Sequence, residues 1–232
     1  MPDIDLYTES PELYDQLQQL RPDYLEAVQA AAVLAGRYAA NSEIRVLDLC
    51  CGTAATTLKF SLLRALTRVE LVDMNADFLR IAKASGIRTR ELTTINIDVR
   101  EYRPSKQFDV VFSMFAYHHV PDSDKEAYVK TIESALTQGG VLLLAEIFLP
   151  DKDSERAYYH ALLQTIPKHE HTEELESFLE QTANSTDFEF KVSKTFADAQ
   201  FVEKGFRLLE EQKIWPKTQD KEGTYVQVYR KS

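Results

Sequence analysis

The sequence predicts a single α/β domain around a mostly parallel sheet, and three observations support this. Short apolar runs alternate with amphipathic segments between residues 45 and 147, as in repeated β-α units. Near the C-terminus two strand-like runs are separated by a gap too short for a helical crossover. A chain of 232 residues with 44% hydrophobic content is long enough to bury one sizeable core. We therefore expect a three-layer, doubly wound, seven-stranded sheet with an antiparallel last strand.

The first five units follow from the periodicity of the apolar residues. Helices are predicted at Tyr24–Tyr38, Thr53–Leu66, Ala76–Ala84 and Ser123–Leu136. Strands are predicted at Arg45–Leu49, Val69–Val72, Thr94–Ile97, Val110–Met114 and Val141–Ile147. Ser123 with Glu126 has the spacing of a capping box, and Gly139–Gly140 is expected to end that helix.

The C-terminal third has a different character. Helices are predicted at Ser154–Gln164, Thr172–Gln181 and Ala197–Lys204. Strands are predicted at Phe206–Ile214 and Thr224–Tyr229, with Pro216 and Gly223 in the turn region between them. We expect one domain over residues 1–232, with its core at about 40–150 and 197–232. Residues 1–22 and 150–196 are expected to form a helical cap over the site.

Composition narrows the classes of function. The net charge of −10, from 37 acidic and 27 basic residues, disfavours a nucleic-acid partner. No apolar run reaches the roughly 18 residues of a membrane span, and Met1–Ser10 is too acidic and polar for a secretory signal. A cytoplasmic location is therefore expected. The adjacent Cys50 and Cys51 are expected to be free thiols, since neighbouring Cα atoms are too close for an ordinary disulfide.

Three short motifs at predicted strand ends carry the functional signal. The segment Asp48–Ala54 joins a buried strand to a helix through small residues, which lets a ligand approach the backbone. Asp73 ends the second strand, where a carboxylate can accept both hydroxyl protons of a ribose. Asp98 follows the third strand, where it could accept a hydrogen bond from an adenine amino group. A plain βα turn, a helix cap and a loop aspartate are the corresponding structural alternatives.

Together these residues resemble the class I S-adenosyl-L-methionine (SAM)-dependent methyltransferase family. Asp48–Ala54 resembles the family's Asp/Glu-x-Gly-x-Gly-x-Gly loop, and Asp73 and Asp98 match its ribose and adenine acids. Phe108–Val111 resembles the start of the fourth strand, and Tyr117–Asp122 a His-His-Leu-Pro-Asp type segment of small-molecule methyltransferases. The resemblance implies SAM as cofactor and S-adenosyl-L-homocysteine (SAH) as product. It places in the cofactor site Asp48, Cys50, Gly52, Ala54, Asp73, Met74, Asp98, Val99 and Met114.

The loop departs from the family pattern at two glycine positions. Cys50 replaces the first glycine and Ala54 the last, so that only Gly52 is retained. Both replacements are small, and we expect these positions to keep φ below zero. Cofactor binding is expected to survive under that condition.

The resemblance indicates a small-molecule acceptor and leaves its identity open. His119 is the favoured general base and His118 the second candidate, since both follow the fourth strand. We expect the acceptor pocket between the N-terminal segment and residues 150–196, with His119 at its floor. Further candidate cap or substrate contacts are Tyr7, Tyr14, Arg21, Tyr117 and Glu146, although a surface role for Glu146 is an equal alternative.

No metal site is predicted from the sequence. His160, His169 and His171 lie near acidic residues, but their spacing is not distinctive. Three alternatives to the favoured function remain open. They are a macromolecular (RNA or protein) methyltransferase, a non-methylating SAM-binding protein, and a nicotinamide-binding enzyme on a Rossmann-like fold.

Overall fold

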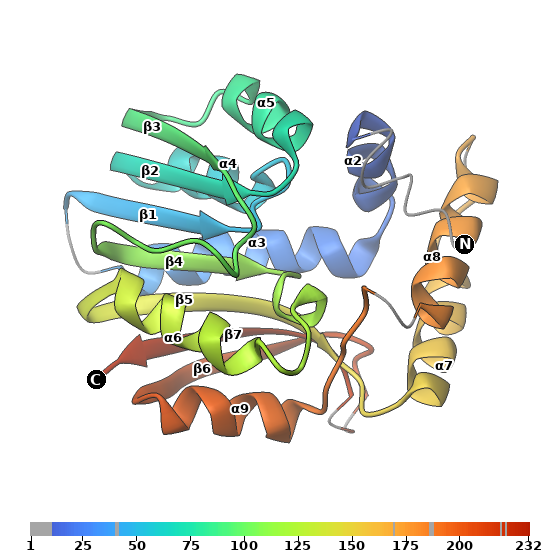
Figure 1. The fold of residues 1–232 in the computed structure, drawn as a ribbon. Coiled ribbons are helices and arrows are strands. Elements are labelled where there is room, and N and C mark those ends of the chain that lie inside the picture. Colours follow the sequence, from blue (N-terminus) through green and yellow to red (C-terminus); the bar gives the residue numbers. More distant parts are fainter. Residues whose placement is uncertain (1–10, 40–41, 169, 186–187, 219, 221) are drawn as a thin grey trace.

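Seven strands form one twisted sheet in the computed structural model, which describes residues 11–39, 42–168, 170–185, 188–218, 220 and 222–232. The strands lie in the order β3-β2-β1-β4-β5-β7-β6 (Figure 1). β7 is antiparallel to both β5 and β6, and the other neighbouring pairs are parallel. The predicted fold class is confirmed. The bounds are β1 Ile44–Leu49, β2 Leu66–Asp73, β3 Thr89–Asn96, β4 Phe108–Met114, β5 Leu136–Phe148, β6 Phe206–Trp215 and β7 Gly223–Lys231.

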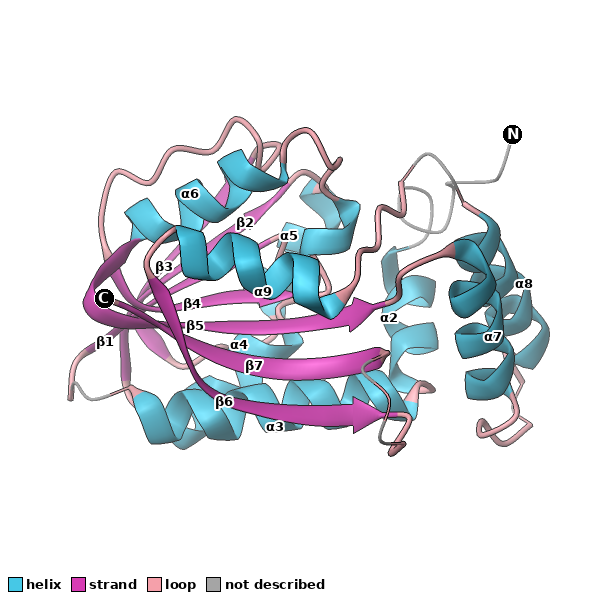
Figure 2. Cartoon of the chain, turned by 90° about the horizontal axis from the view of Figure 1, so that it is seen from below, coloured by secondary structure: helices cyan, strands magenta, loops and turns pink. Residues whose placement is uncertain are grey.

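Helices cover both faces of the sheet. α3 (Pro22–Tyr38), α4 (Ala55–Leu63) and α5 (Ala76–Ala84) bury one hydrophobic cluster against one face. α6 (Lys125–Ala135) and α9 (Lys194–Glu203) bury a second cluster against the other face. Figure 2 shows α6 and α9 on one side of the strands and α3 on the opposite side. The stretch Leu142–Ala145 of β5 is buried and apolar on both faces because helices cover both.

The topology places a crevice between β1 and β4. β1 lies beside β4 in the sheet, while β2 and β3 follow β1 in the opposite direction. The connections from β1 and β4 therefore diverge to opposite sides of the sheet. In open α/β sheets ligands bind at the carboxyl ends of strands at this switch point.

A group of helices lies beyond the carboxyl ends of the strands. It consists of α2 (Pro11–Gln19), α7 (Lys152–Leu163) and α8 (Thr172–Asn184), which stand at one end of the sheet in Figure 1. Leu17 of α2 shares a hydrophobic cluster with Tyr158 of α7 and Phe178 of α8. The N-terminal segment and the long insertion after β5 thus pack together near the β1–β4 crevice.

The predicted capping box of Ser123 and Glu126 is wrong. α6 begins at Lys125, and the residue before it makes no side-chain capping bond. The backbone N–H groups of Asp124 and Lys125 donate instead to the carbonyl of Pro121 at 2.8 and 3.1 Å, so the first donors already have partners. Glu126 pairs with the Lys204 amine at 2.6 Å.

Two predicted helix boundaries also differ. The helix expected over Thr53–Leu66 spans only Ala55–Leu63, because Leu66 already pairs with Ile44 in the sheet. Gly139–Gly140 lies inside β5 rather than before it, since α6 ends at Ala135 and the chain pairs with β4 from Leu136. The pairing register of β4 and β5 shifts between Phe108 and Val110. Gly139 lies in β5 opposite this shift and has a φ of +74°. Among the described residues, no helix has the length and apolar character needed to cross a membrane.

Candidate functional site

The loop after β1 has a glycine-like backbone despite its sequence. Cys50, Gly52 and Ala54 have φ values of +52°, +51° and +59°. The expectation that Cys50 and Ala54 keep φ below zero is therefore wrong. Side chains in this left-handed region cost about 1–2 kcal/mol, so surrounding contacts must hold the loop there. In the described part of the chain, the positive-φ residues other than glycine are Cys50, Ala54 and Phe115, and all three lie at the carboxyl ends of β1 and β4.

Asp73 connects the tip of β2 to this loop. Its Oδ2 accepts the N–H of Gly52 at 2.8 Å, and its Oδ1 accepts the N–H of Asn75 at 2.8 Å. Burial raises the pKa of Asp73, and the two backbone donors oppose that shift. Each carboxylate oxygen has a second lone pair for a ligand hydroxyl. Two such oxygens at one strand tip suit a vicinal diol.

Asp48 lies inside β1 below the loop. It is buried, and its Oδ2 accepts the hydroxyl of Thr57 at 2.7 Å, which ties the first turn of α4 to the strand. Burial raises the pKa of Asp48 to about 7, and the Asp73 charge acts in the same direction. The charge of Asp73 therefore influences the protonation of Asp48.

At the carboxyl end of β3, the polar group Asp98 is already bonded to a protein side chain. Asp98 is held by Arg100, which donates to it through its backbone N–H at 2.9 Å and through its guanidinium. This pairing lowers the pKa of Asp98. Val99 is buried, whereas Met74 beside Asp73 is 73% exposed. The exposed Met74 side chain, next to Asp73, offers an apolar surface at the carboxyl ends of β2 and β3.

Phe115 marks the end of β4 and was missed by the sequence analysis. It follows the half-buried Met114 and has a φ of +54°, and its N–H donates to the Ala145 carbonyl at 2.7 Å. Its ring stacks on Tyr24 of α3, with the centroids 5.6 Å apart. Its positive φ sets Phe115 apart, and this can be seen only in the structure. In the sequence nothing distinguishes this aromatic residue from those of the core.

The short helix η1 (Tyr117–His119) places two histidines beside β5. The His118 backbone N–H donates to Glu146 Oε2 at 3.1 Å, and His118 Nδ1 hydrogen-bonds to Oε1 of the same carboxylate. Glu146 is 1% exposed and also accepts the Ile147 N–H at 2.7 Å, so the alternative of a surface role is wrong. Burial raises the pKa of Glu146 to about 7 and lowers that of His118 well below its usual range.

Glu189 lies on the other side of the two imidazoles. Its Oε2 is 3.6 Å from His118 Nε2, and its Oε1 is 3.9 Å from His119 Nδ1. His119 Nδ1 also hydrogen-bonds to the Phe188 carbonyl at 2.9 Å, and the Phe190 N–H donates to the His118 carbonyl at 2.7 Å. These contacts bind the segment before α9 to η1.

Glu189 is ionised although it is buried. Burial acts to raise its pKa, but the adjacent Lys191 ammonium and both histidines lower the pKa to about 2. The Lys191 side chain is itself 0% exposed and forms an ion pair with Glu189. His119 is the more open of the two histidines, with its side chain 32% exposed, and in its charged form it lowers the pKa of Asp73. The histidine cluster and the β2 carboxylate are thus close enough to interact.

Two cap candidates have other roles. Tyr117 is fully buried, packs against Tyr128 and Phe201, and donates its hydroxyl to Gln200, so it faces the core rather than an acceptor. The buried guanidinium of Arg21 donates to both oxygens of Asp23 and to Gln18. These bonds engage three of the five N–H donors of the guanidinium.

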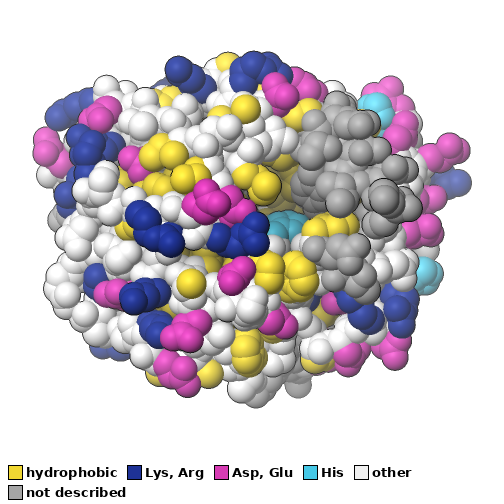
Figure 3. Space-filling view, viewed as in Figure 1, with side chains coloured by type: hydrophobic (Ala, Val, Ile, Leu, Met, Phe, Trp, Pro, Cys, Tyr) yellow, Lys and Arg dark blue, Asp and Glu magenta, His cyan; other side chains and the backbone are white. Residues whose placement is uncertain are grey.

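α2 lies over the loop after β1. Asp15 accepts the hydroxyl of Thr53 at 2.6 Å, and Glu12 pairs with Arg80 of α5 at 2.8 Å. Tyr14 packs against Phe78 and Phe178, and burial raises its pKa to about 12. Tyr7 lies outside the described residues. Figure 3 shows histidine surface recessed between hydrophobic and acidic side chains on this side of the molecule.

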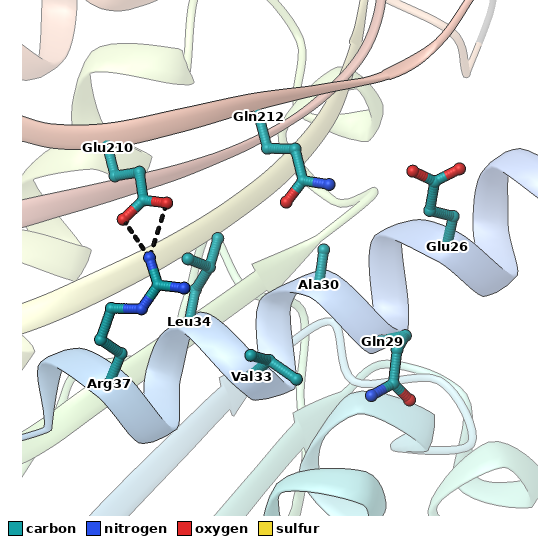
Figure 4. Close-up of a pocket in the computed structure, with 8 residues that line it drawn as sticks. All are labelled: Glu26, Gln29, Ala30, Val33, Leu34, Arg37, Glu210 and Gln212. Atoms are coloured by element: carbon teal, nitrogen blue, oxygen red, sulfur yellow. Dashed lines mark hydrogen bonds and ion pairs between the residues drawn. The ribbon is translucent and has the colours of Figure 1, made fainter.

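A separate surface hollow lies along the outer side of α3 and β6. It is lined by Glu26, Arg37, Glu210 and Gln212 among others, and Arg37 pairs with Glu210 across it (Figure 4). Its volume of about 210 Å³ is smaller than the roughly 300–1,000 Å³ of typical ligand pockets. None of the predicted site residues lines it.

Comparison with known proteins agrees with this geometry. Residues 46–140 match the family model described as a methyltransferase domain. The matched region contains the loop, Asp73, Asp98 and η1. This part of the chain is therefore similar to a methyltransferase domain.

Two curated relatives and one solved structure illustrate the similarity to this family. The chain is 26% identical over 150 residues to carboxy-S-adenosyl-L-methionine synthase of Dichelobacter nodosus, covering 63% of this chain and 62% of the synthase. It is 29% identical over 138 residues to the ubiquinone/menaquinone biosynthesis C-methyltransferase UbiE of Shewanella frigidimarina, covering 56% of this chain and 53% of UbiE. The chain thus matches little more than half the length of these relatives.

The solved structure is that of the N-methyltransferase NodS from Bradyrhizobium japonicum WM9 in complex with SAH. It superimposes with a TM-score of 0.63, covering 91% of this chain and 88% of NodS. The two sequences are 12% identical, so this likeness shows a common methyltransferase fold.

Proposed function

We propose that this protein transfers the methyl group of SAM to a small-molecule acceptor by in-line displacement and releases SAH. The observation that carries the proposal is the contact between Asp73 and the left-handed loop Cys50–Ala54 at the β1–β4 switch point. The match of residues 46–140 to a methyltransferase domain and the relatives whose names refer to SAM or methyl transfer support it.

In this proposal the cofactor spans the carboxyl ends of β1 to β4. Asp73 binds the ribose hydroxyls, and Met74, Asp98 and Val99 surround the adenine. The amino-acid part of SAM lies against the loop that contains Cys50, Gly52 and Ala54, above the buried Asp48, with Met114 on the β4 side.

The acceptor in this proposal lies under α2 and the segment of residues 150–196, beside His119. That imidazole is the more open member of the histidine cluster, and it is near Asp73. Proximity and alignment supply much of the rate in methyl transfer, and a base contributes when the acceptor must lose a proton. The net charge of −10 supports a small molecule rather than a nucleic acid as acceptor.

Calorimetric titration tests the cofactor. SAM or SAH should bind with a dissociation constant in the micromolar range, about −8 kcal/mol, and NAD(H) should not bind. Asp73→Ala should weaken SAM by more than tenfold, because it removes two buried acceptor oxygens. Asp98→Ala should have a smaller effect, since Arg100 already engages that carboxylate. Asp77→Ala on the exposed start of α5 is the matched control. Binding of NAD(H) alone, or equal effects of Asp73→Ala and Asp77→Ala, would contradict the proposal.

A non-methylating use of SAM is a second candidate, because one relative bears the name of a carboxy-SAM synthase. Mass spectrometry of the reaction products distinguishes the two. Methyl transfer yields SAH and an acceptor heavier by one methylene unit, whereas modification of the cofactor yields a heavier SAM derivative and no SAH.

A further inference from the structure

Three metal-binding side chains converge beside η1. His118, His119 and Glu189 each offer one ligand atom, and these atoms all lie within 4.8 Å of one another. The histidines come from the end of β4, and the glutamate comes from a segment about 70 positions later in the chain. Two imidazoles and one carboxylate form a donor set that binds Zn²⁺ or non-haem Fe²⁺.

The distances suit one ion between the three groups. Metal–nitrogen and metal–oxygen bonds of about 2.0–2.2 Å place neighbouring ligand atoms roughly 3–3.5 Å apart. His118 Nε2 and Glu189 Oε2 are 3.6 Å apart, and His119 Nδ1 and Glu189 Oε1 are 3.9 Å apart. Movements of about 1 Å would bring the set, whose atoms lie within 4.8 Å of one another, to bonding distance, and His119 Nδ1 would exchange its hydrogen bond to the Phe188 carbonyl for the metal.

The surroundings of His118 are those of a metal ligand. Its Nδ1 is bonded to Glu146, which is 1% exposed and is oriented by the backbone N–H groups of His118 and Ile147. A histidine that binds metal nearly always uses its second ring nitrogen in such a bond to a carboxylate or carbonyl. When Nδ1 donates to Glu146, the lone pair of Nε2 faces the Glu189 carboxylate. Two facing electron pairs are satisfied by a cation between them, either a proton on Nε2 or a metal ion.

Charge balance agrees with a bound cation. Around the cluster the buried carboxylates are Glu146, Glu189 and Glu155, and the buried ammonium next to Glu189 is Lys191. Glu155 pairs with Lys152 at 2.8 Å, so Glu146 and Glu189 carry −2 when ionised against the single charge of Lys191, and a cation in the cluster would offset the remaining negative charge. Lys191 approaches Glu189 Oε2, so Oε1, which faces His119, remains the oxygen nearer the open side.

We propose that His118, His119 and Glu189 bind one divalent transition-metal ion of the Zn²⁺ or Fe²⁺ type, with Glu146 orienting His118. Only His119 of the three ligands is substantially exposed, so the remaining coordination positions lie on the His119 side of the cluster. Resting on the proposed function, this places the acceptor on the metal through an oxygen or nitrogen atom. A metal-bound hydroxyl loses its proton more easily, and His119 then acts as a ligand rather than as a free base.

Cobalt titration of the full chain tests the site without SAM or acceptor. After treatment with a chelator and dialysis, Co²⁺ should give visible absorption that saturates at one ion per chain, and Zn²⁺ should displace it. His119→Ala removes the most exposed ligand and should weaken Co²⁺ more than the roughly 10- to 100-fold expected for Glu146→Gln. Glu189→Gln should act like His119→Ala. His160→Ala, an exposed histidine of α7, is the control and should leave binding unchanged.

The outcomes separate the metal site from the methyltransferase proposal. Absence of stoichiometric Co²⁺ binding, or binding that survives His119→Ala in a folded protein, overturns the metal site. Circular dichroism and SAM titration of His119→Ala establish that the variant is folded. SAM binding with no metal binding leaves the proposed function intact, whereas metal binding with no SAM binding removes the proposed function alone.

Discussion

The carboxyl end of β1–β2 and the carboxyl end of β4–β5 are built differently. At β1–β2 the polar groups come from two consecutive strands within residues 48–75, and Asp73 is held by the backbone N–H groups of Gly52 and Asn75. At β4–β5 the charges come from distant segments, and Glu189 meets Lys191, His118 and His119 in a buried cluster. The first region depends on backbone conformation and the second on charge pairing. Substitutions in the two regions should therefore change the stability of the protein for different physical reasons.

The largest effect should follow from breaking the buried charge pair. Glu189→Gln leaves the buried Lys191 ammonium with only the more distant Glu155 carboxylate, 3.9 Å away, which should lower the unfolding free energy by about 3–5 kcal/mol. Glu91→Gln is the matched control, since Glu91 pairs with Arg68 at the surface and such pairs contribute about 0–1 kcal/mol. Urea unfolding measures both. Equal losses would show that the cluster at β4–β5 is no more dependent on charge pairing than the surface.

A pH-dependent effect should appear at the β1 end. Burial raises the pKa of Asp48 to about 7, whereas the same carboxyl in the unfolded chain titrates near 4. Between these values the folded state retains a proton that the unfolded state loses, so stability falls as the pH rises. Asp48→Asn should remove up to about 1.4 kcal/mol per pH unit of that slope between about pH 4 and 7. Denaturant unfolding at several pH values measures this slope. If Asp48→Asn left the pH dependence of the unfolding free energy unchanged, the raised pKa of Asp48 would be contradicted.

The smallest effect should come from relieving the strained loop. Ala54→Gly removes a Cβ from a residue with a φ of +59° and should stabilise the protein by up to about 1 kcal/mol. Ala31→Gly is the control, because Ala31 is equally buried within α3, and there glycine should cost about 1 kcal/mol. Thermal unfolding compares the two. A loss of stability in both variants would mean that the loop at β1 is not strained.

The sequence predicts the carboxyl end of β1–β2 better than it predicts the carboxyl end of β4–β5. Asp48, Asp73 and Asp98 were placed at strand ends by the alternation of apolar runs, because strand ends are local features of the chain. The φ values of Cys50 and Ala54 were predicted with the wrong sign, since residue size does not reveal which strain the surrounding contacts impose. The position of Glu146 inside β5 was known, but its burial depended on η1 and the segment before α9 covering it.

The sequence by itself determined the order of strands and helices, the antiparallel end of the sheet and the strand-end carboxylates. These follow from periodicity, turn residues and short spacings, which involve only neighbouring positions. Tertiary structure alone decided that Tyr117 faces the core, that Asp23 is buried and accepts the Tyr158 hydroxyl, and that Glu189 meets His118 and His119. Those outcomes depend on packing between segments far apart in the chain, where burial makes each charge require a partner.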